Sequence, residues 1–185
     1  MRPDKPFLVG NQEFAALYSV KPQMIGQWMH RGVLDPANSV VVSGVHYWPL
    51  GFAAEFGATT PRPKHVDESL LQELVKSQSP GWMGRNPADL PPIVGQQEII
   101  ALFGLPSQGT LAMTIASGRF PSADWELSGS ALWLLDTVMD ATPELKDSAR
   151  SLAWTVDAEV LAALREGRYD GPGSQVLARG RAARP

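Results

Sequence analysis

The chain lacks cysteine, and this absence removes several classes of function at once. Its 185 residues contain no thiol, so disulfides, thiolate nucleophiles and cysteine-based zinc sites are excluded. The three histidines do not have metal-ligand spacing, so we expect neither a metal site nor a cofactor. A chain without cysteine also agrees with a reducing cytoplasm.

Long apolar runs are missing as well. No window reaches about 18 uninterrupted apolar residues, so we expect no transmembrane helix and no membrane contact. Residues 1–7 are polar and lack the apolar core of a secretory signal. These two absences predict a cytoplasmic protein.

Enzyme motifs are also absent. The sequence has no glycine-rich phosphate loop, no Gly-x-Ser-x-Gly and no convincingly placed pair of carboxylates. Ser43 and Ser128 each precede a glycine, and we interpret both as turn residues. We therefore expect that the protein is not an enzyme.

Positive charge is scarce and unevenly distributed. The net charge is −3, whereas nucleic-acid-binding domains usually carry a basic patch. Residues 1–57 hold four Lys/Arg and four Asp/Glu, but residues 91–142 hold one cation, Arg119, against five acids. The two halves of the chain therefore differ in their electrostatics.

What the chain does contain is an internal repeat. Residues 8–17, LVGNQEFAAL, match residues 93–102, IVGQQEIIAL, at a shift of 85 positions. The same shift relates a second set of residues, in which Pro36, Ser43, Gly44 and Trp48 match Pro121, Ser128, Gly129 and Trp133. Self-similarity at a fixed offset predicts one structural unit used twice.

Both copies predict the order helix, turn, helix, hairpin, helix. In the first copy, Pro22 suits the first position of the second helix and Gly32 suits its end. The ranges expected there are 12–18, 22–31, 39–49 for the hairpin and 50–56. The second copy gives 97–103, 108–117, 125–133 for the hairpin and 134–140. One extra residue before Gly118 brings Met113 near the position of Trp28.

The remaining segments predict a linker and a helical end. An amphipathic helix is expected over residues 67–77, between a Pro-rich stretch at 59–64 and a Gly- and Pro-rich stretch at 79–92. The predicted division of the chain is 1–57, 58–92, 93–142, a helical segment at 143–167 and a disordered basic tail at 168–185. The apolar stripes at 67–77 and 143–166 are candidate helices for a homodimer or higher oligomer, or braces between the units.

Three stretches of the first copy, residues 8–17, 20–32 and 36–48, resemble a known family. They are similar to the small winged helix-turn-helix domains of phage excisionases, AlpA-type regulators and MerR-type regulators. The second copy resembles this pattern more weakly, through residues 101–105 and 117–121 and through Trp133. The resemblance implies an α+β fold, mainly α, in which a helical linker joins two winged helix-turn-helix units, the second degenerate.

The same resemblance implies that residues 22–31 form a recognition helix in the major groove of double-stranded DNA. Glutamine can pair with adenine edges, and arginine with guanine edges or phosphate. The implied DNA-contacting residues of the first copy are Lys21, Gln23, Met24, Gln27, His30 and Arg31, with Ser43 and His46 in the wing. In the second copy they are Gln108 and Arg119.

The sequence supports two candidate functions, which belong to different classes of protein. The first is a sequence-specific DNA-binding protein, a transcriptional regulator or excisionase-like architectural factor of a bacterium, phage or mobile element, associated with the nucleoid. The second is a protein-interaction or assembly module, such as a phage packaging or structural adaptor, that keeps the fold without specific DNA readout. The acidic second copy and a wing tip without Lys or Arg favour the second.

Overall fold

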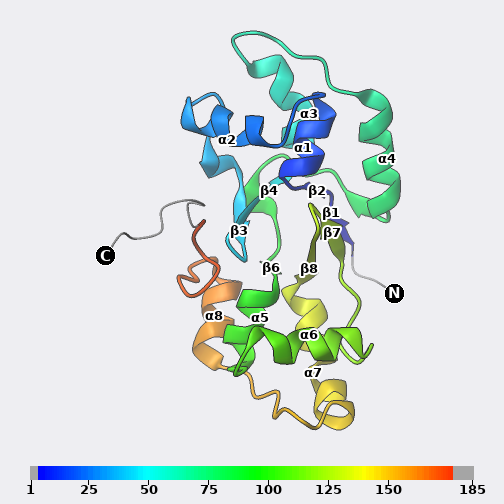
Figure 1. Cartoon of the computed structure of the whole chain (residues 1–185), viewed down its shortest axis with the longest axis vertical. Coiled ribbons are helices and arrows are strands. Elements are labelled where there is room, and N and C mark those ends of the chain that lie inside the picture. Colours follow the sequence, from blue (N-terminus) through cyan, green and yellow to red (C-terminus); the bar gives the residue numbers. More distant parts are fainter. Residues whose placement is uncertain (1–3, 177–185) are drawn as a thin grey trace.

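Two similar units lie one above the other along the long axis of the molecule (Figure 1). The computed structural model describes residues 4–176. The chain belongs to the α+β class, with about 47% of it helical and with small sheets between the helices. This confirms the predicted fold class at that level.

The first unit has the predicted order of helices and hairpin, preceded by a short strand that was not predicted. Its elements are β2 (Leu8–Val9), α1 (Asn11–Leu17), α2 (Gln23–His30), β3 (Val40–Val42), β4 (Val45–Pro49) and α3 (Leu50–Thr59). Strand β4 lies between β2 and β3 and is antiparallel to both. The hairpin turns at Ser43 and Gly44, whose φ angles are 47° and 77°. Two positive φ angles are typical of a type I′ turn, whose twist matches that of a hairpin.

The second unit repeats this order. Its elements are β6 (Ile93–Val94), α5 (Gln96–Phe103), α6 (Gln108–Ala116), β7 (Trp125–Leu127), β8 (Ser130–Leu134) and α7 (Leu135–Ser148). Its hairpin turns at Ser128 and Gly129, with φ angles of 49° and 77°. The expected end of the last helix at residue 140 was wrong, because Pro143 lies inside α7 rather than at the start of a new helix.

A fourth helix completes each unit, so the repeat is longer than the sequence identity suggested. Helix α4 (Glu68–Gln78) packs on α1, and α8 (Ala158–Arg165) packs on α5. The N–H of Asp67 donates to the carbonyl of Leu17 at 2.7 Å, and that of Asp157 to the carbonyl of Leu102 at 2.8 Å. The expected linker helix and C-terminal helical segment therefore have equivalent positions.

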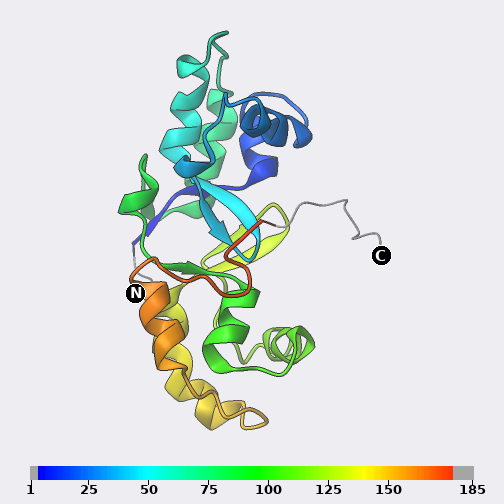
Figure 2. The same ribbon diagram turned by 90° about the vertical axis from the view of Figure 1, so that its left-hand side faces the viewer.

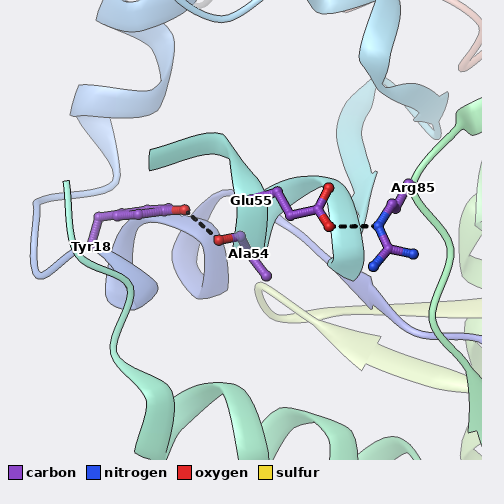
Figure 3. A network of polar contacts seen from close by, with 4 residues as sticks. All are labelled: Tyr18, Ala54, Glu55 and Arg85. Carbon is purple, nitrogen blue, oxygen red and sulfur yellow. Dashed lines mark hydrogen bonds and ion pairs between the residues drawn. The ribbon is translucent and has the colours of Figure 1, made fainter. Parts of the chain in front are cut away.

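The linker after α4 is tied to the first unit. Strand β5 (Gly81–Trp82) pairs in parallel with β1 (Lys5–Pro6). Arg85 forms an ion pair with Glu55 of α3 at 2.6 Å, while the hydroxyl of Tyr18 donates to the carbonyl of Ala54 at 3.2 Å (Figure 3). Both contacts hold α3 in place, one from the linker and one from the end of α1.

The segment that follows α8 is ordered over its described part. Tyr169 packs on the core of the second unit, and the N–H of Gly44 donates to the carbonyl of Gly173 at 2.9 Å. The expectation of a disordered tail from residue 168 was therefore wrong for residues 168–176. The arginines at 179, 181 and 184 lie outside the described residues.

Residues 4–176 form three apolar cores. One lies inside each unit, and each contains the tryptophan of its hairpin, Trp48 or Trp133. The third lies between the units and combines residues of both sheets, namely Leu8, Val42, Tyr47, Trp125, Leu127, Leu132 and Leu134. Because this shared core is buried, the two units form one packed body.

Candidate nucleic-acid interface

Helix α2 carries most of the predicted base-contacting residues on its outer side. Ile25 and Trp28, three residues apart, face inward and pack into the core of the first unit. This spacing leaves the opposite side of a helix in solvent. We call the outer set the α2 face. It consists of Lys21, Gln23, Gln27, His30 and Arg31, all exposed, and Met24, which is half-buried.

A loop between α3 and α4 lies against α2. The Nζ of Lys64 lies 5.6 Å from the centroid of the Trp28 ring and donates to the carbonyl of Arg62 at 3.1 Å. The backbone N–H of Lys64 donates to the carbonyl of Gly57 at 2.9 Å. We call residues 60–66 the basic loop. Sequence reasoning described this segment only as extended and missed its proximity to α2.

The α2 face and the basic loop lie in segments without acidic residues. Residues 18–34 and 56–66 together contain Lys21, Arg31, Arg62 and Lys64, two histidines and no Asp or Glu. Within residues 4–176 the ion pairs are Arg85–Glu55 and Arg168–Glu166, and neither includes these four cations. Cations that have no acidic partner inside the protein can neutralise phosphate groups.

Helix α6 is the counterpart of α2, with a shift of one residue relative to the rest of the repeat. Leu111 and Thr114 are buried, as are Ile25 and Trp28 in α2. The turns at Gly118 and Gly32 have φ angles of 76° and 72°. Thr114 therefore occupies the position of Trp28. Met113 lies next to Thr114 and so near that position, and the extra residue is inserted at the start of the helix.

The outer side of α6 differs chemically from the α2 face. Met113 is 75% exposed and takes the position of Gln27. The positions of His30 and Arg31 are taken by Ala116 and Ser117. We call the exposed residues Gly109, Ala112, Met113, Ala116 and Ser117 the α6 face.

The two residues predicted for DNA contact in the second copy are both exposed. Gln108 donates from its Nε2 to the Oε1 of Gln96 at 3.2 Å. Arg119 follows Gly118, after the end of α6. They therefore flank the α6 face at its two ends.

Both hairpin tips are engaged within the chain. The backbone N–H of Ser43 donates to Glu98 Oε1 at 2.6 Å, and its hydroxyl lies 3.0 Å from both carboxylate oxygens. The same hydroxyl accepts the N–H of Gln97 at 3.1 Å. The tip of the first hairpin thus caps the first turn of α5.

The second hairpin makes the reciprocal contact. The N–H of Ser128 donates to Glu13 Oε2 at 3.2 Å, and its hydroxyl lies 3.1 Å and 2.9 Å from the carboxylate oxygens. The hydroxyl also accepts the N–H of Gln12 at 3.1 Å. We call the two contacts the clasps. They relate the units as the two subunits of a symmetric dimer are related.

The surroundings of Ser43 and His46 conflict with the DNA contacts predicted for them. The polar groups of Ser43 are already used by Glu98 and Gln97. His46 is half-buried, stacks on Trp48 at 5.7 Å between ring centroids, and bonds through Nδ1 to the hydroxyl of Ser39 at 2.7 Å. Burial lowers the pKa of His46, which disfavours the charged form that would attract phosphate.

A cavity of about 520 Å³ lies beside the first clasp. Its walls come from β3, from residues 87–93 and from the chain around α8. Glu98 borders it, and burial raises the pKa of this carboxyl despite the hydrogen bonds from Ser43. Tyr169 also lines the cavity, and burial together with the nearby Glu98 raises its pKa to about 12. The described residues contain no group of three or more His, Cys, Asp or Glu that could hold a metal ion.

The apolar stripes expected to form a dimer face inward. Leu70, Leu71, Leu74 and Val75 of α4 pack against the core of the first unit, and Val160, Leu161 and Leu164 of α8 against that of the second. A homodimer through these stripes conflicts with this packing. Among residues 4–176, no single helix has the length and apolar character needed to cross a bilayer.

Helices α2 and α6 project from the same side of the molecule. In Figure 2 both lie on the right-hand side, α2 above and α6 below, while α7 and α8 lie on the left. The clasped hairpins lie between them.

No family model matches the chain, and no curated protein or solved structure is significantly similar to it. The geometry described above is therefore the main evidence for function.

Proposed function

We propose that the protein binds double-stranded DNA with sequence specificity through the α2 face and the basic loop. In this proposal each unit is a winged helix-turn-helix of the excisionase, AlpA and MerR type, with α2 as the recognition helix. The setting is the nucleoid of a bacterium, or DNA of a phage or mobile element, where the protein acts as a regulator or architectural factor.

One observation carries the proposal. Helix α2 has an exposed face with glutamine, histidine and arginine, and its Trp28 contacts Lys64 of a loop with two further cations. Residues 18–34 and 56–66, which hold this face and this loop, contain no acid. Arg31 and Gln27 suit guanine and adenine edges, whereas Lys21, Arg62 and Lys64 suit phosphates. The net charge of −3 does not exclude this, because neither segment contains an acid, although Asp35, Glu55 and Asp67 border them.

The test is binding to duplexes that the full chain selects from a random-sequence library. Gln27→Ala and Arg31→Ala each remove a side chain outside the core, so folding is retained and affinity for the selected duplex falls. A lost base contact weakens binding by about 1–3 kcal/mol, which is a loss of affinity of roughly five- to 150-fold. Lys76→Ala, an exposed cation on α4, is the matched control and leaves affinity unchanged. Wild-type affinity in both α2 variants contradicts the proposal.

The second candidate function is an interaction or assembly module, and the clasps favour it. Hairpin tips held by Glu98 and Glu13 are not free to contact a nucleic-acid backbone. Met113, 75% exposed on an apolar helix face, is the kind of residue that protein interfaces use. Failure of the chain to retain any duplex at low salt, together with stable oligomers in light scattering, favours this candidate.

A further inference from the structure

The clasps make α2 and α6 equivalent elements of one rigid body. Each helix follows the helix whose first turn is capped by the hairpin of the other unit. The shared core of Leu8, Tyr47 and Trp125 with their neighbours fixes the units against each other. A surface that approaches one of the two helices along their common side therefore approaches the other as well (Figure 2).

The α6 face is small and apolar where the α2 face is polar. At the position of Gln27 stands Met113, and at that of His30 stands Ala116. Ala112 and Gly109 add no polar side chain. The hydroxyl of Ser117, at the end of the face, donates to the carbonyl of Thr114 at 2.8 Å. The other four residues cannot pair with the donors and acceptors of base edges, but they let a helix approach closely and contact the thymine methyl group, which apolar side chains recognise in the major groove.

We propose that the α6 face is a second DNA-docking surface, which recognises thymine methyl groups. It takes an A·T-rich duplex segment beside the segment bound by the α2 face, so that one chain occupies an asymmetric site in two parts. The inference rests on the proposed function and adds to it the chemistry of the second part of the site.

The division of charge between the units fits this arrangement. Phosphate neutralisation supplies much of the affinity for DNA, and Lys21, Arg31, Arg62 and Lys64 lie on the α2 face and the basic loop. The second unit brings mainly Arg119 to its helix, so it binds poorly alone. Once α2 is docked, the rigid connection between the units raises the effective concentration of the α6 face at the neighbouring segment.

The test first locates the segment next to α6. The chain has no cysteine, so Ser122→Cys, after α6 and outside the α6 face, and Ala37→Cys, its counterpart after α2, each give a unique attachment point for a DNA-cleaving reagent. The probe is the duplex that the wild-type chain selects from a random-sequence library. Cleavage by the two conjugates in two adjacent segments is expected, and cleavage by both within a single segment overturns the inference.

Deoxyuridine then replaces thymidine in the segment cleaved by the Ser122→Cys conjugate, which removes only the methyl groups. Wild-type affinity falls by about fourfold for each methyl contacted, the effect of one buried methyl-sized group. Met113→Gln, which restores the residue type of the α2 position, loses this sensitivity. Gln27→Met is the matched control and retains it, because it alters only the α2 face.

The outcomes separate the inference from the proposed function. A wild-type chain that binds the selected duplex with equal affinity before and after the deoxyuridine replacement overturns the inference and leaves DNA binding by α2 standing. A chain that selects no duplex overturns both. A third outcome is that the wild-type chain forms oligomers, that these disappear in Met113→Gln, and that the pattern of DNA cleavage stays unchanged in this variant. This outcome would show that the α6 face binds protein, and it also overturns the inference.

Discussion

Glu98, in the first turn of α5, accepts the backbone N–H of Ser43 from the opposite hairpin at 2.6 Å and lies 3.0 Å from its hydroxyl. Glu13 and Ser128 repeat this contact in the other direction. Each clasp needs a helix from one unit and a hairpin from the other. The duplication thus produced, within a single chain, an interface of the reciprocal kind found in symmetric dimers.

The clasps predict that any side chain added at Gly10 or Gly95 destabilises the folded protein. A Cβ on Gly10 would lie less than 3.0 Å from the hydroxyl oxygen of Ser128, and a Cβ on Gly95 equally close to that of Ser43. Gly10→Ala and Gly95→Ala should each lower the free energy of unfolding by about 1–3 kcal/mol through overpacking. Urea denaturation measures this.

Gly26→Ala is the control for these variants. It lies on α2 with no atom within 4 Å of its would-be Cβ, so alanine should raise the free energy of unfolding by about 0.5–1 kcal/mol. Combining Gly10→Ala with Ser128→Gly removes the clash and should recover part of the loss. If the two substitutions lower the free energy of unfolding additively, the loss in Gly10→Ala does not come from a clash with Ser128.

Glu98 should make stability depend on pH. Burial raises its folded-state pKa above the ordinary value of 4.5, so between these two values the folded state binds more protons than the unfolded state. Stability therefore falls as pH rises through this window. The difference in unfolding free energy, wild type minus Glu98→Gln, should be constant below pH 4.5, fall above it and then level off. Urea denaturation at a series of pH values gives the curve.

Glu126→Gln controls for the change in net charge. Glu126 is exposed on β7, so this variant removes the same charge outside the clasp. The difference in unfolding free energy between wild type and Glu126→Gln is subtracted, at each pH, from the difference between wild type and Glu98→Gln. A corrected difference that rises with pH below pH 4.5 and is constant above it would show that hydrogen bonds from Ser43, rather than burial, dominate at this carboxyl.

The sequence predicted the local structure of both units well, because local signals define it. Pro22 and Gly32 bound α2, and the Ser-Gly pairs specify both hairpin turns. Long-range packing could not be read in this way. The partner of Ser43 lies 55 positions away, and nothing in the hairpin itself identifies Glu98.

The repeat itself carries a signal for the clasps. Glu13 and Ser43 both recur in the second copy, as Glu98 and Ser128, although many core residues changed between the copies. The fourth helices were missed as part of the repeat because Asp67 and Asp157 fall outside the 85-residue shift, after the longer α7. The predicted α2 contacts are exposed as expected, whereas the basic loop needed the tertiary structure to be found.

The two hairpin tryptophans form a matched pair for measuring one hydrogen bond. Trp133 donates from Nε1 to the carbonyl of Pro121 at 2.9 Å, whereas the buried Nε1 of Trp48 has no partner within residues 4–176. Both rings are buried and contact a phenylalanine edge-on, Phe14 at 5.2 Å from Trp48 and Phe120 at 5.3 Å from Trp133.

Phenylalanine at either position removes a similar volume, so the difference between the variants isolates the hydrogen bond. Trp133→Phe should lower the free energy of unfolding by about 1 kcal/mol more than Trp48→Phe, because it loses a bond that Trp48 does not make. Urea denaturation of both variants measures the difference. An equal or larger loss in Trp48→Phe would mean that this indole does find a polar partner in solution.

The basic loop should contribute to DNA affinity through charge alone. Arg62 is exposed and makes no ion pair within residues 4–176, so Arg62→Ala should leave the free energy of unfolding unchanged. If it contacts one phosphate, its loss weakens binding to all duplexes alike and reduces the slope of log affinity against log salt by about 0.9. Fluorescence anisotropy over a range of salt concentrations gives the slope.

Lys76→Ala is the matched control. It removes one equal charge from α4, away from the basic loop, and should keep the wild-type slope. Equal slopes in the two variants would place the phosphate contacts elsewhere and restrict the DNA interface to the α2 face.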